Sequence, residues 1–190
     1  MIISNLSKKF GKKVIFDNFS LDIGEKGIYA LYGRSGCGKT TLLRIIAGLD
    51  KKYSGNIGFG NIKKISYVFQ EPRLLNNLTA LENVSIVLGN DPFKKEKATS
   101  WLNKMGLEDD ILSYPDEMSG GMKQRVAIAR AFAFDGDILL LDEAFNGIDA
   151  QTTESIMDTV IEYSNSKPCI FVSHDKRQIE YLNCNVITLD

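Results

Sequence analysis

The chain has 190 residues, of which 44% are hydrophobic and 25% are charged. This size and composition are typical of one folded domain and exclude a disordered or fibrous protein. With 23 basic and 24 acidic residues the net charge is −1, so the chain has no broad positive field to hold nucleic acid or an anionic membrane surface. We therefore expect no nucleic-acid partner.

The sequence also argues against a segment that crosses a membrane. A spanning helix needs about 18 or more apolar residues, whereas the most apolar run, residues 138–141, is flanked by Asp137 and Asp142. The first residues lack the basic-then-apolar pattern of a signal peptide. Three cysteines without CxxC spacing indicate neither a disulfide framework nor a zinc site. We expect the chain to stay in the cytoplasm.

The opening segment, residues 2–23, alternates in polarity and contains the turn Phe10-Gly11-Lys12. Alternation with a central glycine turn is typical of an antiparallel hairpin. The sequence predicts a small antiparallel β-subdomain at the start of the chain.

Short apolar runs and amphipathic segments of helical length follow in alternation. The apolar runs are nearly continuous and cover residues 28–32, 65–69, 138–141, 170–172 and 186–189. The amphipathic segments cover residues 40–49, 121–134 and 152–164. Continuous runs indicate strands buried on both faces, as in a mainly parallel sheet covered by helices. The predicted fold class is α/β.

Residues 81–107 show helical spacing without a strand run, and Pro92 and Gly106 interrupt them. We interpret residues 76–117 as a helical subdomain inserted between two strands. The whole chain, residues 1–190, is interpreted as a single domain.

Residues 33–40 read Gly-Arg-Ser-Gly-Cys-Gly-Lys-Thr and fit the pattern G-x-x-x-x-G-K-[ST] between a strand and a helix. The glycines let successive N–H groups face an anion, Lys39 neutralises the β- and γ-phosphates, and the Thr40 hydroxyl suits Mg²⁺. The alternative is a glycine-rich turn that only caps a helix. The candidate nucleotide-binding residues here are Gly33, Arg34, Ser35, Gly36, Cys37, Gly38, Lys39, Thr40 and Thr41.

Two carboxylates, Asp142 and Glu143, end the apolar run at residues 138–141. Consecutive residues at a strand end point to different sides, so Asp142 can serve Mg²⁺ while Glu143 faces the attacking water as general base. Residues 33–40 are called the phosphate loop below. If the chain lacked this loop, a purely structural interpretation of the two carboxylates would be equally good.

A second candidate anion site lies at residues 118–125, which read Met-Ser-Gly-Gly-Met-Lys-Gln-Arg. Ser119 is a good N-cap, Gly120 and Gly121 expose backbone N–H groups, and the helix that follows adds its dipole. An ordinary capped helix is the alternative, but it leaves the paired glycines unexplained.

This segment resembles the LSGGQ-type signature of ABC ATPases, with Met118 in place of Leu and Met122-Lys123 at the Gln position. The resemblance covers almost the whole chain in the expected order. It implies the core fold of P-loop NTPases, ATP as substrate and Mg²⁺ as cofactor. It also implies that each ATP lies between the phosphate loop of one subunit and the signature of a second copy or a homologous cassette.

The same resemblance assigns four more residues. Gln70 matches the Q-loop glutamine, which touches Mg²⁺ and water, and Phe10 matches the aromatic residue that stacks on adenine. Asp149 matches the D-loop aspartate, and His174 matches the switch histidine that contacts the γ-phosphate. The alternatives are core packing for Phe10 and an ordinary surface or core position for His174. A hydrolase triad at residues 173–175 is not implied, because consecutive residues cannot converge in triad geometry.

The predicted function is that of the ATP-hydrolysing subunit of an ABC transporter, peripheral on the inner face of the cell membrane. The implied partners are a transmembrane permease and an extracytoplasmic substrate-binding protein. Residues 67–75 and 78–84 look most like importers of the nitrate, sulfonate and taurine type, which usually carry Pro-Trp where this chain has Asn76-Asn77.

Three other functions remain open from the sequence. The first is the ATPase of an exporter, although half-exporters normally fuse the permease to the cassette. The second is a non-transport ABC ATPase acting on DNA or ribosomes, and the third is a regulatory cassette that binds nucleotide without hydrolysing it. The presence of both Glu143 and His174 disfavours the third.

Overall fold

The computed structural model describes residues 1–189, and its strands form two sheets. The strands are β1 (Ile2–Phe10), β2 (Lys13–Asp22), β3 (Gly27–Tyr32), β4 (Ser54–Gly58), β5 (Ile65–Val68), β6 (Ile138–Asp142), β7 (Pro168–Val172) and β8 (Asn185–Thr188). The three-stranded sheet is antiparallel in the order β2-β1-β4. The five-stranded sheet is parallel in the order β5-β6-β7-β3-β8.

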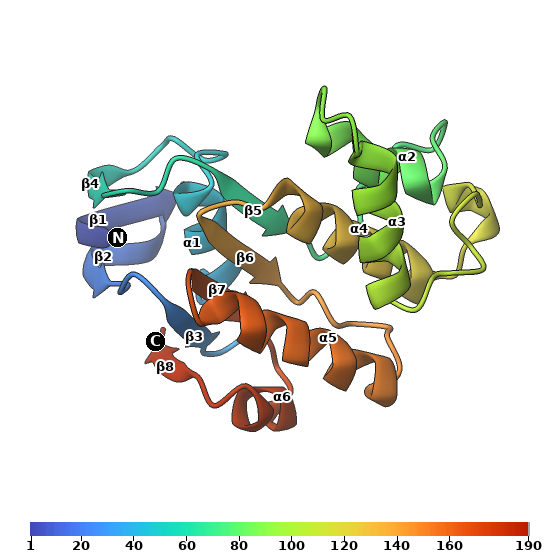
Figure 1. The fold of residues 1–190 in the computed structure, drawn as a ribbon. Coiled ribbons are helices and arrows are strands. Elements are labelled where there is room, and N and C mark those ends of the chain that lie inside the picture. The colour runs from blue at the N-terminus through green and yellow to red at the C-terminus, as the bar shows by residue number, and fades with distance from the viewer. Residues whose placement is uncertain (190) are drawn as a thin grey trace.

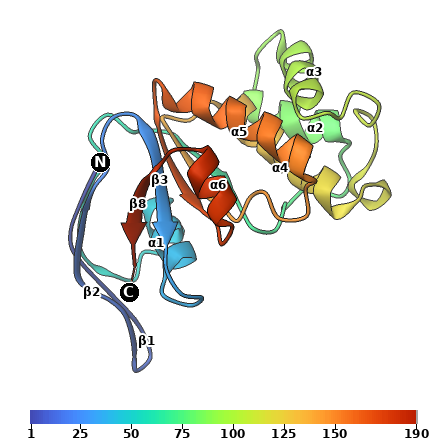
Figure 2. The same ribbon diagram turned by 90° about the horizontal axis from the view of Figure 1, so that it is seen from below.

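Helices lie against the parallel sheet, and some of them form a separate group beyond one end of it (Figures 1 and 2). They are α1 (Lys39–Ile46), α2 (Ala80–Ser85), α3 (Lys94–Lys104), α4 (Gly120–Phe134), α5 (Ala150–Ser164) and α6 (Lys176–Tyr181), with 3₁₀ turns at Ile86–Leu88 and Pro115–Glu117. Among residues 1–189, none of these helices is long and apolar enough to cross a bilayer.

The core consists of two hydrophobic clusters, one on each face of the parallel sheet. Successive strand residues point to opposite faces, so Leu139 and Leu141 pack with α4 and α5, while Ile138 and Leu140 pack with α1 and the antiparallel sheet. All five residues of β6 are buried. Burial on both faces explains the continuous apolar runs and confirms the predicted α/β class.

The N-terminal hairpin is confirmed, with Phe10 opposite Lys13 beside the turn. The structure adds β4, which pairs with β1 and which the sequence did not predict. Its sequence, Ser-Gly-Asn-Ile-Gly, contains one large apolar residue, so it carries no hydrophobic pattern of its own. It forms a strand because the edge of β1 supplies the hydrogen-bonding partners.

The chain between β5 and β6 is helical, as predicted. The helical spacing across residues 81–107 is broken, because α2 ends early and Gly89 turns the chain with a φ of 59° before α3 begins. Helix α4 packs against α2 and α3, beyond the predicted limit at residue 117. The division into a separate subdomain at residues 76–117 stays a prediction.

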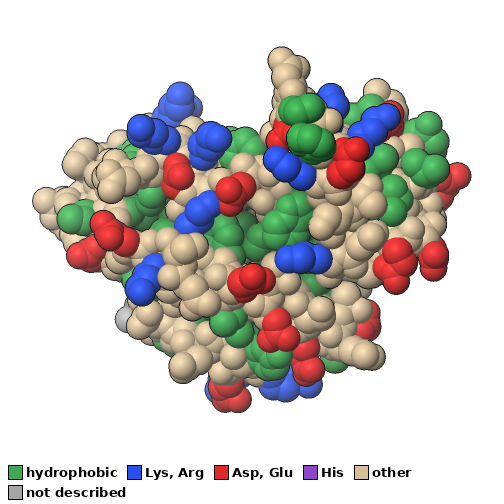
Figure 3. Space-filling model, viewed as in Figure 1, with side chains coloured by type: hydrophobic (Ala, Val, Ile, Leu, Met, Phe, Trp, Pro, Cys, Tyr) green, Lys and Arg blue, Asp and Glu red, His purple; other side chains and the backbone are tan. Residues whose placement is uncertain are grey.

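Hydrophobic side chains lie on the surface at this helical end, interspersed with charged ones (Figure 3). The large exposed ones in this part of the chain are Leu75, Ile86, Phe93, Leu112 and Tyr114. An exposed apolar surface of this kind is typical of a contact face for another protein.

Candidate functional site

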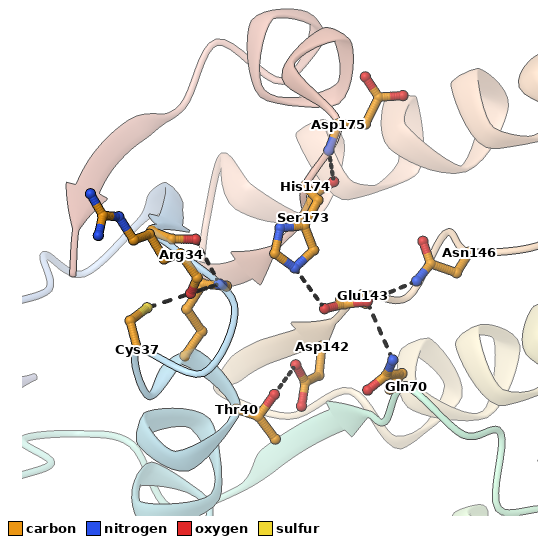
Figure 4. Close-up of polar contacts among 12 residues, drawn as sticks. Arg34, Cys37, Thr40, Gln70, Asp142, Glu143, Asn146, Ser173, His174 and Asp175 are labelled. Carbon is orange, nitrogen blue, oxygen red and sulfur yellow. Dashed lines mark hydrogen bonds and ion pairs between the residues drawn. The ribbon is translucent and has the colours of Figure 1, made fainter. Parts of the chain in front are cut away.

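The candidate site lies at the carboxyl edge of the parallel sheet, where β3, β6 and β7 end side by side (Figure 4). Residues 33–38 follow β3, Glu143 follows β6, and residues 173–175 follow β7. Parallel strands place all their carboxyl ends at the same edge, which is why segments far apart in sequence meet there.

The phosphate loop leads directly into α1, whose N-terminus is bare. The N-cap is Gly38, which provides no side-chain cap, and the first turn contains no acidic residue. The N–H groups at the start of the helix are therefore available to an anion. Gly38 has a φ of 113°, and a Cβ there would lie 2.8 Å from the Phe16 ring. Only glycine fits this position without strain.

Lys39 is buried and folds back under the loop that precedes it. Its Nζ donates hydrogen bonds to the carbonyl oxygens of Gly33 at 2.9 Å and Arg34 at 3.0 Å. The Cys37 sulfur lies 3.9 Å from the same nitrogen (Figure 4). The ammonium group is thus fixed within the loop that the sequence predicts to surround the phosphates.

Thr40 and Asp142 meet across the site. The Thr40 hydroxyl donates to Asp142 Oδ1 at 2.9 Å, and the Tyr67 hydroxyl donates to Asp142 Oδ2 at 3.1 Å. Burial raises the pKa of Asp142, and the nearby charge of Glu143 acts in the same direction, while the two hydrogen bonds oppose the rise. The sequence analysis proposed Thr40 and Asp142 as metal ligands and missed Tyr67.

These groups fit Mg²⁺. Within residues 1–189 no three His, Cys, Asp or Glu side chains cluster as a complete metal site. One hydroxyl and one carboxylate are instead the small set of hard oxygen ligands that Mg²⁺ uses when substrate phosphates and water complete its shell. Thr40 and Asp142 can therefore hold the ion only together with a bound nucleotide. The predicted role of Gln70 as a third ligand stays a prediction, because the contact the structure gives Gln70 is with Glu143.

Three side chains converge on the Glu143 carboxylate (Figure 4). His174 Nε2 lies 3.1 Å from Oε1, and Oε2 accepts hydrogen bonds from Gln70 Nε2 at 3.3 Å and Asn146 Nδ2 at 2.9 Å. The Glu143 backbone has a φ of 50° and donates its N–H to the Val172 carbonyl at 3.0 Å. This left-handed turn directs Glu143 away from Asp142, so the two carboxylates have different partners.

The structure thus brings together Glu143, His174 and Gln70, three of the residues that the sequence analysis proposed as catalytic. It adds Asn146, to which the sequence analysis assigned no role. Its position three residues after Glu143, in a tight turn, was the one signal that could have identified it.

Residues 173–175 do not form a triad. The Ser173 hydroxyl donates to Gln178 at 2.7 Å and accepts from the Asp175 N–H at 3.0 Å. Asp175 caps α6 by accepting from the Arg177 N–H. Only His174 points to Glu143, which agrees with the expectation from the sequence.

Phe10 lies at the tip of the N-terminal hairpin with 53% of its surface exposed, so the alternative of core packing was wrong. The Lys8 ammonium lies 4.5 Å from its ring centre. The same hairpin reaches the phosphate loop, where Lys13 Nζ donates to the Gly36 carbonyl at 3.3 Å. Stacking of adenine on Phe10 stays a prediction.

The signature segment begins α4. The Ser119 hydroxyl accepts from the Met122 N–H at 3.2 Å, and Ser119 and Gly120 are exposed. A Cβ on Gly121 would collide with the Gly147 carbonyl oxygen, which fixes the signature against the turn before α5.

The N-terminus of α4 lies at the helical end of the molecule, away from α1 in both ribbon views (Figures 1 and 2). The predicted D-loop residue Asp149 is exposed and caps α5 by accepting from the Thr152 N–H at 2.9 Å. The two candidate anion sites of one chain therefore face different regions of space.

Comparisons with known proteins agree with this geometry. Residues 16–146 match the ABC transporter family. The aliphatic sulfonates import ATP-binding protein SsuB of Bacillus cereus is 37% identical over 98% of this chain and 80% of its own length, and SsuB 2 of Mesorhizobium japonicum is 41% identical over 99% and 76%. The sulfate/thiosulfate import ATP-binding protein CysA of Escherichia coli is 35% identical over 98% of this chain and 56% of its own length.

Solved structures give the same result. The dimeric ATP-binding cassette MJ0796, bound to ADP and Pi in a post-hydrolysis state, superposes with a TM-score of 0.88 and 31% identity, over 100% of this chain and 94% of that one. At these identities and coverages, the chain belongs to the ABC transporter family, of which it is an ATP-binding cassette.

Proposed function

We propose that this cassette hydrolyses ATP to drive a membrane permease that imports a small solute. The observation that carries the proposal is the placement of the Glu143 carboxylate, with His174 and Gln70, next to the Thr40–Asp142 pair at one sheet edge. A carboxylate that can accept a proton from water, beside hard oxygen ligands and an anion-binding loop, is what phosphoryl transfer to water needs.

Binding begins at the phosphate loop. The bare N-terminus of α1 and the Lys39 ammonium offer positive charge and N–H donors for the β- and γ-phosphates. Phe10 offers an exposed aromatic face for the adenine ring, and Lys13 lies nearby at the loop. Thr40 and Asp142 would hold Mg²⁺, whose contribution when bound would be to neutralise phosphate charge.

Hydrolysis is assigned to Glu143 acting as general base. His174 contacts Oε1 of this carboxylate, and Gln70 and Asn146 donate hydrogen bonds to Oε2. The carboxylate is therefore oriented before substrate binds. It would take the proton of the attacking water, while His174 contacts the γ-phosphate. Preorganised groups of this kind need little rearrangement in the transition state.

The working unit is a dimer. Ser119, Gly120 and Gly121 form a helix N-terminus, exposed at Ser119 and Gly120, that lies away from the phosphate loop of the same chain. We infer that they contact an ATP bound by another copy or by a homologous cassette. Asp149 would lie at the same dimer interface. The peripheral location on the inner membrane face follows from docking to a permease. Leu75 and the other exposed apolar residues of the helical end are suited to this contact.

The solute class is proposed from the relatives. The names of these relatives describe the import of aliphatic sulfonates and of sulfate or thiosulfate, which are sulfur oxyanions. An extracytoplasmic binding protein would deliver the solute to the permease. Asn76-Asn77, in the segment that leads to α2, lies close to the proposed permease surface.

Uptake in a strain that lacks this gene tests the proposal. Labelled ethanesulfonate uptake should be lost in that strain and restored by the wild-type gene, but not by Glu143→Gln. Labelled nitrate and sulfate serve as comparison solutes. Unchanged uptake of all three solutes, or loss of efflux instead of uptake, would contradict an importer of oxyanions.

A further inference from the structure

The register of the parallel sheet places Tyr67 beside the metal carboxylate. Tyr67 on β5 pairs with Leu140 on β6, and Asp142 follows two residues later on the same face of that strand. This face is covered by α1, which begins at Lys39 and carries Thr40. A tyrosine at this register position is long enough to reach the carboxylate of the neighbouring strand, and its hydroxyl donates to Asp142 Oδ2 at 3.1 Å.

The two oxygens of Asp142 therefore have one donor each. Oδ1 receives the hydroxyl of Thr40, a small group that can rotate to coordinate a metal ion. Oδ2 receives the hydroxyl of Tyr67, which has no comparable freedom because it is attached to a ring held on several sides. The Tyr67 bond thus sets the plane of the carboxylate, while the Thr40 bond can be exchanged for a metal contact.

Neighbouring groups hold the Tyr67 ring in place. It stacks on Phe69 with ring centres 4.0 Å apart and an angle of 23° between the planes. The Phe69 carbonyl accepts a hydrogen bond at 3.1 Å from Gln124, whose side chain is buried in α4. The Arg73 guanidinium lies 4.1 Å from the centre of the Phe69 ring. These contacts anchor the tyrosine to the segment that carries Gln70.

We propose that Tyr67 is a positioning residue for the metal ion: its hydroxyl fixes the Asp142 carboxylate so that Oδ1 faces the ion together with Thr40. The assignment rests on the proposed ATPase function. It goes beyond the sequence analysis, in which Tyr67 only begins the importer-like segment 67–75 and has no role of its own. Groups that orient a metal ligand in this way change metal affinity about 10–100-fold when they are removed.

The test compares the affinity for AMP-PNP with excess Mg²⁺ and with EDTA, by titration calorimetry on the whole chain. The ratio of the two affinities measures the contribution of the metal. Tyr67→Phe keeps the ring and removes the hydroxyl, so we expect this ratio to fall about 10-fold or more while the affinity in EDTA stays within about twofold. Tyr163→Phe is the matched control, because its hydroxyl donates to the Gly136 carbonyl away from the site, and its ratio should not change.

The outcomes separate this inference from the proposed function. A wild-type protein whose affinity does not depend on Mg²⁺ would overturn both. If Asp142→Asn abolishes the metal dependence and Tyr67→Phe leaves it within twofold, only the role of Tyr67 is overturned. Thermal unfolding of each variant checks the fold, with Tyr67→Met as a second variant lacking the hydroxyl. If neither Tyr67→Phe nor Tyr67→Met folds, Tyr67 is needed for the stability of the core, and the proposal is overturned.

Discussion

The hydroxyl of Thr40 donates a hydrogen bond of 2.9 Å to Asp142, 102 residues further along the chain. This bond joins the first turn of α1 to the last residue of β6, two elements that the sequence analysis linked only through their motifs. The joined elements bring the phosphate loop and the carboxylates to one place, and several measurable consequences follow.

Glu143→Gln should stop hydrolysis and spare nucleotide binding. The amide keeps the shape and can still bond to His174 or Asn146, but it cannot take a proton from water, so phosphate release should fall about 10²–10⁴-fold. Glu162→Gln, an exposed position on α5, is the control. Light scattering should show the Glu143→Gln protein dimerising with MgATP, and a monomer with bound ATP would contradict the shared site.

Lys39→Ala should weaken ATP binding about 10–100-fold, because a charged donor to the phosphates is removed. Calorimetric titration measures the effect. Lys95→Ala, which removes an exposed ammonium from α3, should leave the affinity unchanged. Equal ATP affinities for both variants and the wild type would mean that Lys39 only stabilises its own loop, through its hydrogen bonds to the Gly33 and Arg34 carbonyl oxygens.

Thr40→Val should reduce the dependence of ATP affinity on Mg²⁺. Valine has nearly the same shape as threonine and lacks the oxygen ligand, so the ratio of affinities with Mg²⁺ and with EDTA should fall about 10-fold or more. Thr159→Val, at a half-buried threonine on α5 outside the site, is the matched control. A ratio that stays at the wild-type value would argue that Asp142 holds the ion without Thr40.

Asp50→Asn should destabilise the fold at neutral pH. The buried Lys8 ammonium donates to Asp50 Oδ1 at 2.8 Å, and this bond holds the pKa of Asp50 below its ordinary value of 3.8. An acid whose pKa is lower in the folded than in the unfolded state stabilises the folded protein above its unfolded pKa. This stabilisation is lost as the pH falls through the folded pKa. Urea unfolding at pH 7 should therefore show a loss of about 1.5–3 kcal/mol that shrinks below about pH 4.

Asp17→Asn, an exposed aspartate on β2, is the control for the Lys8–Asp50 pair. Its free energy of unfolding should stay near the wild-type value across the same pH range. A loss in Asp50→Asn that is independent of pH would assign the effect to packing and not to the ion pair.

Gly121→Ala and Gly120→Ala form a matched pair within the signature. A Cβ at residue 121 meets the Gly147 carbonyl, whereas nothing lies within 4 Å of one at residue 120. Gly121→Ala should cost about 1–3 kcal/mol through overpacking, which corresponds to a fall in Tm of roughly 2–12 °C for a domain of this size. Gly120→Ala should unfold near the wild-type temperature, and equal melting temperatures for the two variants would contradict the contact with Gly147.

The sequence predicted the parts of the fold that have a strong local pattern. Both faces of β6 are buried, so its unbroken run of isoleucine and leucine indicated a strand without further information. The predicted α/β class, the ABC family and the function as its ATP-binding subunit are confirmed. Strand β4 could not be predicted, because the backbone edge of β1 stabilises it and its own side chains contribute little.

The candidate site likewise contains residues that the sequence could predict and one that it could not. The motifs placed Lys39, Asp142 and Glu143, because each chemical role needs a fixed residue type at a fixed spacing. Tyr67 escaped detection because its contact depends on the strand register, which a single sequence does not reveal. The individual roles assigned to Phe10, Gln70 and Asp149 stay predictions until the variants are measured.

Helix α4 has a mechanical consequence for the whole molecule. Its first turn carries the signature, whereas near its other end the Ala131 carbonyl accepts a hydrogen bond from Ser66 of β5 at 2.8 Å. At 1.5 Å per residue its 15 residues span roughly 22 Å without a proline or glycine after the first turn. The helix is thus a stiff element, so a force applied at the helical end would reach the start of β5, at the edge of the sheet opposite to the catalytic residues, with little loss to bending.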